Sequence, residues 1–174
     1  DAFEQSDSGL SLVDMMDLDL LVGSGGVLSH APRREQSTRM LIDAFMPEGI
    51  TQLAVDSIFM MPQLGVLVNI DQQDLAENAH KAALDVFNKD CLVRLGTCIA
   101  PVGNTKPGAL MLTGELTMPD GSNQQVELHQ GQLLSIPADY EAINATLRPA
   151  KGFDIGAGKS EEISTTIYGG VVGL

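Results

Sequence analysis

The sequence predicts an α/β fold over residues 1–91, followed by a small antiparallel β barrel or sandwich over residues 92–174. Two observations carry this prediction. In the first part, short apolar runs alternate with segments whose apolar residues recur every three or four positions, as in the strands and helices of α/β proteins. In the second part, short runs rich in Val, Ile, Leu and Thr are separated by turns rich in Gly, Pro, Asn and Asp, a spacing typical of all-β domains.

The composition is that of a globular protein and disfavours several functional classes. Of 174 residues, 44% are hydrophobic and 19% are charged, and the net charge is −13. A nucleic-acid partner is not expected, because phosphate contacts need a basic patch and the few Lys and Arg residues are scattered. No apolar run reaches the length of a membrane helix and no signal peptide is recognisable, so we expect a cytoplasmic protein without membrane contact. The absent initiator Met and the apolar C-terminal run lead us to expect a piece of a larger protein.

A glycine-rich turn is the most distinctive local feature of the first part. The strand-like run Leu18–Val22 ends in Gly23, Ser24, Gly25 and Gly26. Glycines permit positive φ and leave backbone N–H groups accessible, and a helix after the turn would add an anion site at its N-terminus. The turn matches neither the dinucleotide-binding Gly-x-Gly-x-x-Gly pattern nor the phosphate-binding P-loop. Two interpretations therefore stay open: a tight structural turn, or a contact with phosphate or nucleotide.

A helix is predicted after this turn. Ser29 is its expected N-cap, and Pro32 falls near the first helical turn, where proline is tolerated. Pro47 and Gly49 end the helix. Its buried face is expected to carry small or apolar residues, namely Ser37, Met40, Leu41, Ala44 and Phe45.

The chain then continues with one strand and two helices. Ile50–Val55 is the predicted strand, and Asp56 is expected to cap the next helix rather than to act in a functional site. Ile58–Val68 is predicted as a buried helix, with a strand over Leu64–Ile70 as the open alternative. The clearest helix starts at Asp71 and has one apolar stripe, which consists of Leu75, Ala79, Ala82, Ala83, Val86, Phe87 and Cys91.

Six strands are predicted in the second part, with Pro119-Asp120-Gly121 as a turn between two of them. The strands cover Leu92–Ala100, Leu110–Thr117, Gln125–Leu128, Gln132–Ile136, Ala142–Leu147 and Ile163–Tyr168.

Other candidate sites in the sequence are weak. The segment 156–160 (Gly-Ala-Gly-Lys-Ser) resembles a P-loop in part, but Phe153 stands where that loop needs glycine and a strand-like run follows, so we predict a loop between strands. His80 and His129 have no partner at motif spacing and are expected to be exposed. Cys91 and Cys98 lack zinc-ligand spacing and are expected to be buried free thiols. No pattern for a catalytic residue or a metal site is found.

Four blocks of the sequence carry a resemblance to a known family. The blocks Leu20–Pro32, Ile50–Leu67, Arg94–Pro101 and Gly152–Lys159 strongly resemble the C-terminal part of the glutamate mutase accessory proteins, the L component family. That family looks like a branch of the actin, sugar kinase and Hsp70 superfamily of ATPases, so the resemblance implies that the α/β part belongs to an actin-like ATPase lobe. The resemblance further implies ATP or ADP with Mg²⁺ in the full-length protein, and subunits of an adenosylcobalamin-dependent mutase as partners.

The resemblance also implies a function and a site. By analogy with the diol dehydratase reactivating factors, the family is expected to act as an ATP-driven reactivase or chaperone that exchanges damaged cobalamin. In the superfamily, a Gly-Gly turn between a strand and a helix packs against the adenosine and its phosphates. The matching residues here are Gly23, Ser24, Gly25 and Gly26, with Ser29 and His30 as neighbours.

The chain departs from the superfamily pattern in one respect. The two phosphate-binding Asp-Gly hairpins and the catalytic acid lie N-terminal to the region that it resembles, and Asp154-Ile155-Gly156 is only superficially similar to such a hairpin. The chain alone is therefore expected neither to coordinate Mg²⁺-ATP fully nor to hydrolyse it. The alternative is a non-catalytic scaffold that binds the mutase without nucleotide, in which the Gly turn is purely structural. A small-molecule kinase of the superfamily would need a catalytic acid that the sequence lacks.

Overall fold

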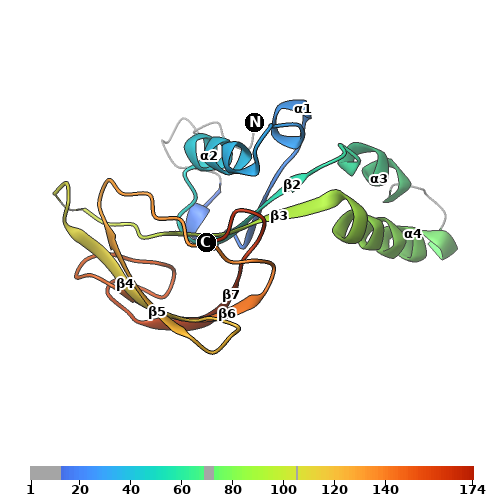
Figure 1. Cartoon of the computed structure of the whole chain (residues 1–174). Helices are drawn as coiled ribbons and strands as arrows, with labels where there is room; N and C mark the ends of the chain where they lie inside the picture. Colours follow the sequence, from blue (N-terminus) through green and yellow to red (C-terminus); the bar gives the residue numbers. More distant parts are fainter. Residues whose placement is uncertain (1–12, 69–72, 105) are drawn as a thin grey trace.

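The computed structural model of the chain describes residues 13–68, 73–104 and 106–174, and shows a mixed α/β structure with two sheets (Figure 1). No helix in these ranges is long and apolar enough to cross a membrane. The helices are α1 (Gly26–Ser29), α2 (Arg34–Phe45), α3 (Met61–Val68) and α4 (Gln73–Val86), with a 3₁₀ turn at Met15–Asp17 and a π-helical turn at Phe87–Cys91. The strands are β1 (Leu20–Gly23), β2 (Gly49–Asp56), β3 (Leu92–Ala100), β4 (Leu110–Thr117), β5 (Asn123–His129), β6 (Ala142–Pro149) and β7 (Ile163–Tyr168).

The first sheet has the strand order β1–β2–β3. β1 runs parallel to β2, with Gly23 opposite Val55, and β3 runs antiparallel to β2. α2 supplies Leu41 to a buried cluster that includes Leu53 and Leu95 of the sheet. The boundary expected between residues 91 and 92 lies just before β3, and the sheet of the first part continues across it.

The second sheet is antiparallel, with the order β5–β4–β6–β7. Its apolar face forms the largest buried cluster, to which Ile50 of β2 and Ile99 of β3 add their side chains. The two sheets therefore share part of one core. Of the barrel or sandwich expected for the second part, the barrel is wrong as far as the structure describes the chain: neither sheet is closed, since β5 and β7 remain edge strands of an open sheet.

One predicted strand of the second part is wrong. Gln132–Ile136 forms no strand of the four-stranded sheet. Instead, the backbone of Ile136 exchanges two hydrogen bonds with that of Leu174, at N···O distances of 2.9 and 2.8 Å. Ile136 thus pairs with Leu174, the last of the C-terminal residues 171–174, called the C-terminal strip below, and this segment does not add a fifth strand. The bounds of β3, β4 and β7 agree with the prediction.

The single helix predicted after the Gly turn is two helices. α1 ends at Ser29, so Ser29 is not an N-cap, and α2 starts at Arg34 with Arg33 as its N-cap. The amide of Arg33 donates to the side chain of Gln36 at 3.1 Å. The physical reason for the break is Pro32, because a residue that precedes proline is disfavoured in the helical region.

α3 and α4 form a hairpin that projects from the ends of β2 and β3 (Figure 1). α3 is a helix, as preferred over the strand alternative, but it starts three residues later than expected because Phe59 has a positive φ of 58°. Leu64, Ala83 and Cys91 form the small core of the hairpin. Of the expected apolar stripe, Ala82 and Val86 are exposed, and Leu75 lies among residues whose side chains are not described.

Candidate functional site

The Gly turn lies at the carboxyl ends of the parallel strands β1 and β2. In open α/β sheets, this edge is where ligands bind. The turn brings Ser24, which follows β1, next to Asp56, the last residue of β2: the Ser24 hydroxyl donates to the Asp56 carboxylate at 3.3 Å. The site is therefore built from the ends of two strands that are 32 residues apart in the sequence.

Asp56 is fully buried, and its carboxylate has backbone donors as well. The amides of Met60 and Met61 donate to it at 3.1 and 2.8 Å. Met61 is the first residue of α3, so Asp56 satisfies an amide at the helix start, although it lies five residues before α3 and is not the expected N-cap residue. The sequence did not predict the contact with Ser24, and a strand-end Asp that faces a Gly-rich turn is the signal that indicates it.

Ser29 stabilises the turn on its buried side. Its hydroxyl is buried and donates to the backbone carbonyl of Asp56. The Arg34 guanidinium donates to the carbonyl of Ser29 at 3.0 Å, and the Ser37 hydroxyl donates to the carbonyl of Leu28 at 2.8 Å. These bonds fasten α1 to both β2 and α2, so Ser29 faces the protein interior rather than the exposed side of the turn.

The three glycines of the turn have different structural roles. A Cβ at Gly23 would lie 2.8 Å from the Leu28 side chain and 2.9 Å from that of Leu41, so any side chain at Gly23 would force these leucines to shift. Gly25 has a φ of 111°, which side chains of L-residues rarely adopt. Gly26 has neither constraint: it is exposed, and a Cβ there would meet no atom within 4 Å.

His30 and Ser24 flank the open side of the turn, and both are exposed. The His30 ring nitrogen Nδ1 lies 3.2 Å from the carbonyl oxygen of Gly26, so the ring stays close to the turn. α1 has only four residues. The dipole that a longer helix would direct at an anion is therefore not available at this turn, contrary to the simplest expectation for a strand–turn–helix unit.

The loop around Lys159 is a connection between β6 and β7, as predicted. Asp154 accepts hydrogen bonds from the amides of Gly156 and Gly158 at 2.8 and 3.1 Å. The Asp154 carboxylate thus closes the loop on itself. No helix follows the loop within the described residues, since β7 begins at Ile163.

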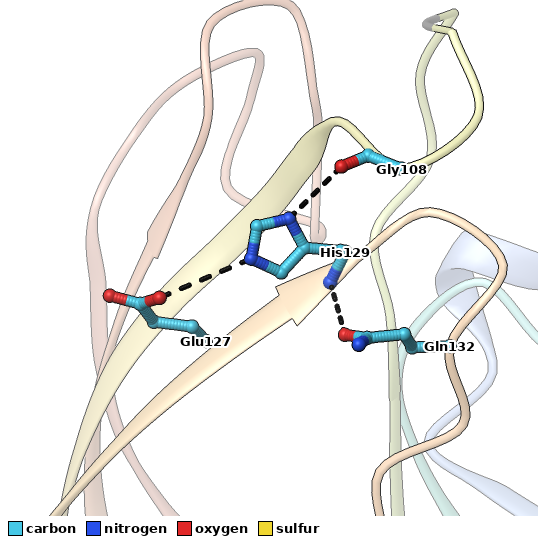
Figure 2. A network of polar contacts seen from close by, with 4 residues as sticks. All are labelled: Gly108, Glu127, His129 and Gln132. Atoms are coloured by element: carbon cyan, nitrogen blue, oxygen red, sulfur yellow. Dashed lines mark hydrogen bonds and ion pairs between the residues drawn. The ribbon is translucent and has the colours of Figure 1, made fainter.

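His129 takes part in a local network at the end of β5, shown in Figure 2. Its Nδ1 lies 3.1 Å from the carbonyl oxygen of Gly108, and its Nε2 lies 4.0 Å from the Glu127 carboxylate. Its backbone amide donates to Gln132 at 3.1 Å. The side chain is 37% exposed, and its contacts fasten the segment before β4 to β5, which is a structural role.

Both cysteines are free thiols, as expected, with Cys91 buried and Cys98 partly buried. Burial raises the pKa of Cys98 to about 11. Burial also raises the pKa of Cys91, with smaller contributions from the negative charges of Asp56 and Asp90. A raised pKa keeps a thiol protonated and unreactive near neutral pH, so neither cysteine has the properties of a nucleophile.

Comparison with known proteins identifies part of the chain. Residues 10–91 match the family model described as MutL protein. The matched segment includes β1, the Gly turn, β2 and the α3–α4 hairpin, and it ends just before β3. No curated protein and no solved structure matches the chain.

Proposed function

We propose, from the match of residues 10–91 to the MutL protein family, that of the glutamate mutase L component, that this chain is part of an ATP-dependent reactivase. The family supports an accessory function for glutamate mutase. In our proposal, the protein acts in the cytoplasm on the subunits of an adenosylcobalamin-dependent mutase. The first sheet and its helices would be part of an actin-like ATPase lobe, and the four-stranded sheet would contact the mutase.

The observation that carries the nucleotide site is the open backbone at Gly26. Packing explains Gly23, and a positive φ explains Gly25, but neither explains Gly26. Glycine at the start of a helix also lowers helix stability relative to alanine. Gly26 lies in the turn at the carboxyl ends of the parallel strands, where ligands bind in open α/β sheets, so in our proposal a ligand lies against its backbone, in space that any side chain would occupy.

In this proposal, the residues of the turn have different roles in nucleotide binding. Gly25 and Gly26 would present backbone against the adenosine side of ATP or ADP, with Ser24 and His30 at the edges. Ser29 and Asp56 would hold the turn in shape from inside the protein. The described residues include no group of three or more His, Cys, Asp or Glu side chains that could hold a metal ion, so the proposal assigns no Mg²⁺ ligand to them.

Gly26→Leu tests this site. We expect the variant to keep the thermal stability of the wild type, because the position is open, and to lose at least about tenfold in ATP and ADP affinity, which corresponds to about 1.4 kcal/mol. Isothermal titration calorimetry of the full-length protein with MgCl₂ present measures the affinity. Gly65→Leu is the matched control, because Gly65 is also an exposed helical glycine, in α3, and a Cβ there would likewise meet no atom within 4 Å.

Equal affinities of wild type, Gly26→Leu and Gly65→Leu would remove the Gly turn from the nucleotide site. A substitution at Gly25 cannot replace this test. Its φ of 111° would strain any side chain, and a loss of affinity would then report a distorted turn rather than a blocked ligand.

A second candidate function is a scaffold that binds the mutase without nucleotide. It is favoured by the exposed apolar side chains near and on α3, since contiguous exposed apolar surface marks interaction sites. Ile58 is 56% exposed, Val66 70% and Leu67 47%. Capture of purified glutamate mutase subunits by the immobilised protein, with and without ATP, separates the two functions: a scaffold captures equally in both, whereas a reactivase captures in a nucleotide-dependent way.

A further inference from the structure

Asp56 contacts two neighbouring parts of the molecule, the Gly turn with α1 and the start of the α3–α4 hairpin. Its carboxylate accepts from Ser24 on one side and from the amides of Met60 and Met61 on the other, and its carbonyl accepts from Ser29. Both hydroxyl groups belong to the Gly turn and its short helix α1, whereas both amides belong to the start of α3. One residue therefore contacts the proposed nucleotide turn and the α3–α4 hairpin.

The burial of Asp56 makes these bonds interdependent. The residue is 0% exposed, so water cannot replace a donor that moves away. A buried carboxylate that loses a donor is destabilised by the desolvation of its charge. A shift of Ser24 therefore changes how strongly the carboxylate holds the amides of Met60 and Met61.

The Asp56 bonds are one of the links that fix the hairpin to the first sheet, together with the bonds from the amide and hydroxyl of Ser57 to the carbonyl of Cys91. α3 packs on α4 and on the π-helical turn, and the pair projects from the ends of β2 and β3 (Figure 1). Its core of Leu64, Ala83 and Cys91 lies within the hairpin itself. The bonds from Asp56 to the first residues of α3 are thus a direct polar link from the sheet to the hairpin.

We propose that Asp56 is a positioning residue that transmits occupation of the Gly turn to the start of α3. This inference rests on the proposed nucleotide site. Nucleotide against Gly25 and Gly26 would immobilise Ser24, and Ser24 would hold the Asp56 carboxylate in the orientation that binds Met60 and Met61. The α3–α4 hairpin, with its exposed apolar residues, would then be ordered when the turn is occupied.

Hydrogen exchange of the full-length protein tests the link. On addition of ATP and Mg²⁺, we expect slower exchange of the amides in residues 23–30 and in residues 57–64. In Asp56→Asn, whose amide group cannot accept at both oxygen positions, ATP should still slow residues 23–30 but no longer residues 57–64. Without nucleotide, Asp56→Asn should speed exchange in both segments by about tenfold, the effect of about 1.4 kcal/mol of local opening.

Ser57→Ala is the matched control. The Ser57 hydroxyl donates to the carbonyl of Cys91 at 2.9 Å and does not contact the turn. Its loss should speed exchange near residue 57 without any effect on residues 23–30, and the response of residues 57–64 to ATP should persist.

The outcomes separate the link from the nucleotide site. Slowing of residues 23–30 alone in the wild type overturns the link and leaves the nucleotide site intact. No response to ATP in either segment overturns the nucleotide site. The link between the turn and α3 is then tested by Asp56→Asn without nucleotide: faster exchange in both segments supports the link, and faster exchange in only one segment overturns the link. If Asp56→Asn does not fold, the wild-type response of residues 57–64 to ATP decides.

Discussion

Replacement of Gly96 by alanine is expected to lower the free energy of unfolding by about 3 kcal/mol or more, because it separates the C-terminal strip from β3. An alanine Cβ at Gly96 would lie 1.6 Å from the carbonyl oxygen of Gly173, which is a backbone atom. The strip is held there by hydrogen bonds from Val171 to Arg94 and from Val172 to Leu95, at 3.1 and 2.9 Å. Urea denaturation followed by circular dichroism measures the loss.

Gly121→Ala is the control for backbone strain at this position. Gly96 has a positive φ of 143°, and Gly121 has one of 83°. A Cβ at Gly121, however, would meet no atom within 4 Å. Its replacement should cost only about 1 kcal/mol, the strain of a left-handed conformation. If both variants lose the same free energy of unfolding, the overlap with Gly173 does not contribute to the loss, and the packing of the C-terminal strip on β3 does not stabilise the protein.

Leu147→Ala is the second variant with a large expected effect. Leu147 of β6 is fully buried in the core of the second sheet, and removal of such a leucine costs about 2–5 kcal/mol. Gly114 of β4 lies opposite Leu147 in the register, and a Cβ at Gly114 would lie 2.9 Å from Cδ2 of Leu147. The missing side chain of Gly114 thus makes room for Leu147.

This geometry predicts a non-additive pair. Gly114→Ala alone should destabilise the protein by about 1–3 kcal/mol through overpacking. In the Leu147→Ala background the loss should be smaller, because the overlap with Leu147 is gone and only the contact with Cγ2 of Val126, at 3.0 Å, remains. Denaturation midpoints of the four proteins in the cycle measure the coupling. Additive losses would show that Gly114 is not retained for the packing of Leu147.

Secondary structure in this chain is largely predictable because local chemistry specifies it. β3, β4 and β7 have the predicted bounds, since β-branched and apolar residues there are bracketed by Gly, Pro, Asn and Asp. The turn at Pro119–Gly121 is confirmed by the hydrogen bond from Gly121 to Met118 at 2.9 Å. The break at Pro32 is not predictable in the same way, because proline is tolerated both inside and just before the first turn of a helix, and the sequence alone does not separate these cases.

The candidate site is also predictable from the sequence only in part. The Gly turn follows from its sequence, because only glycine-rich segments offer an open backbone between a strand and a helix. The separate roles of Gly23, Gly25 and Gly26 do not follow from it, since they depend on Leu28 and Leu41, on the backbone angle, and on the empty space beside the turn.

Local patterns therefore predict strands, helices and a Gly-rich turn after the first strand, and the resemblance of the sequence blocks indicates the family. Pairing over long distances needed the folded chain. β3 looks like a strand of the β part, yet it completes the first sheet beside β2, because the α3–α4 hairpin returns the chain antiparallel to β2. The bond between Ser24 and Asp56 likewise joins residues 32 positions apart, and no local preference of either residue specifies a contact over that distance.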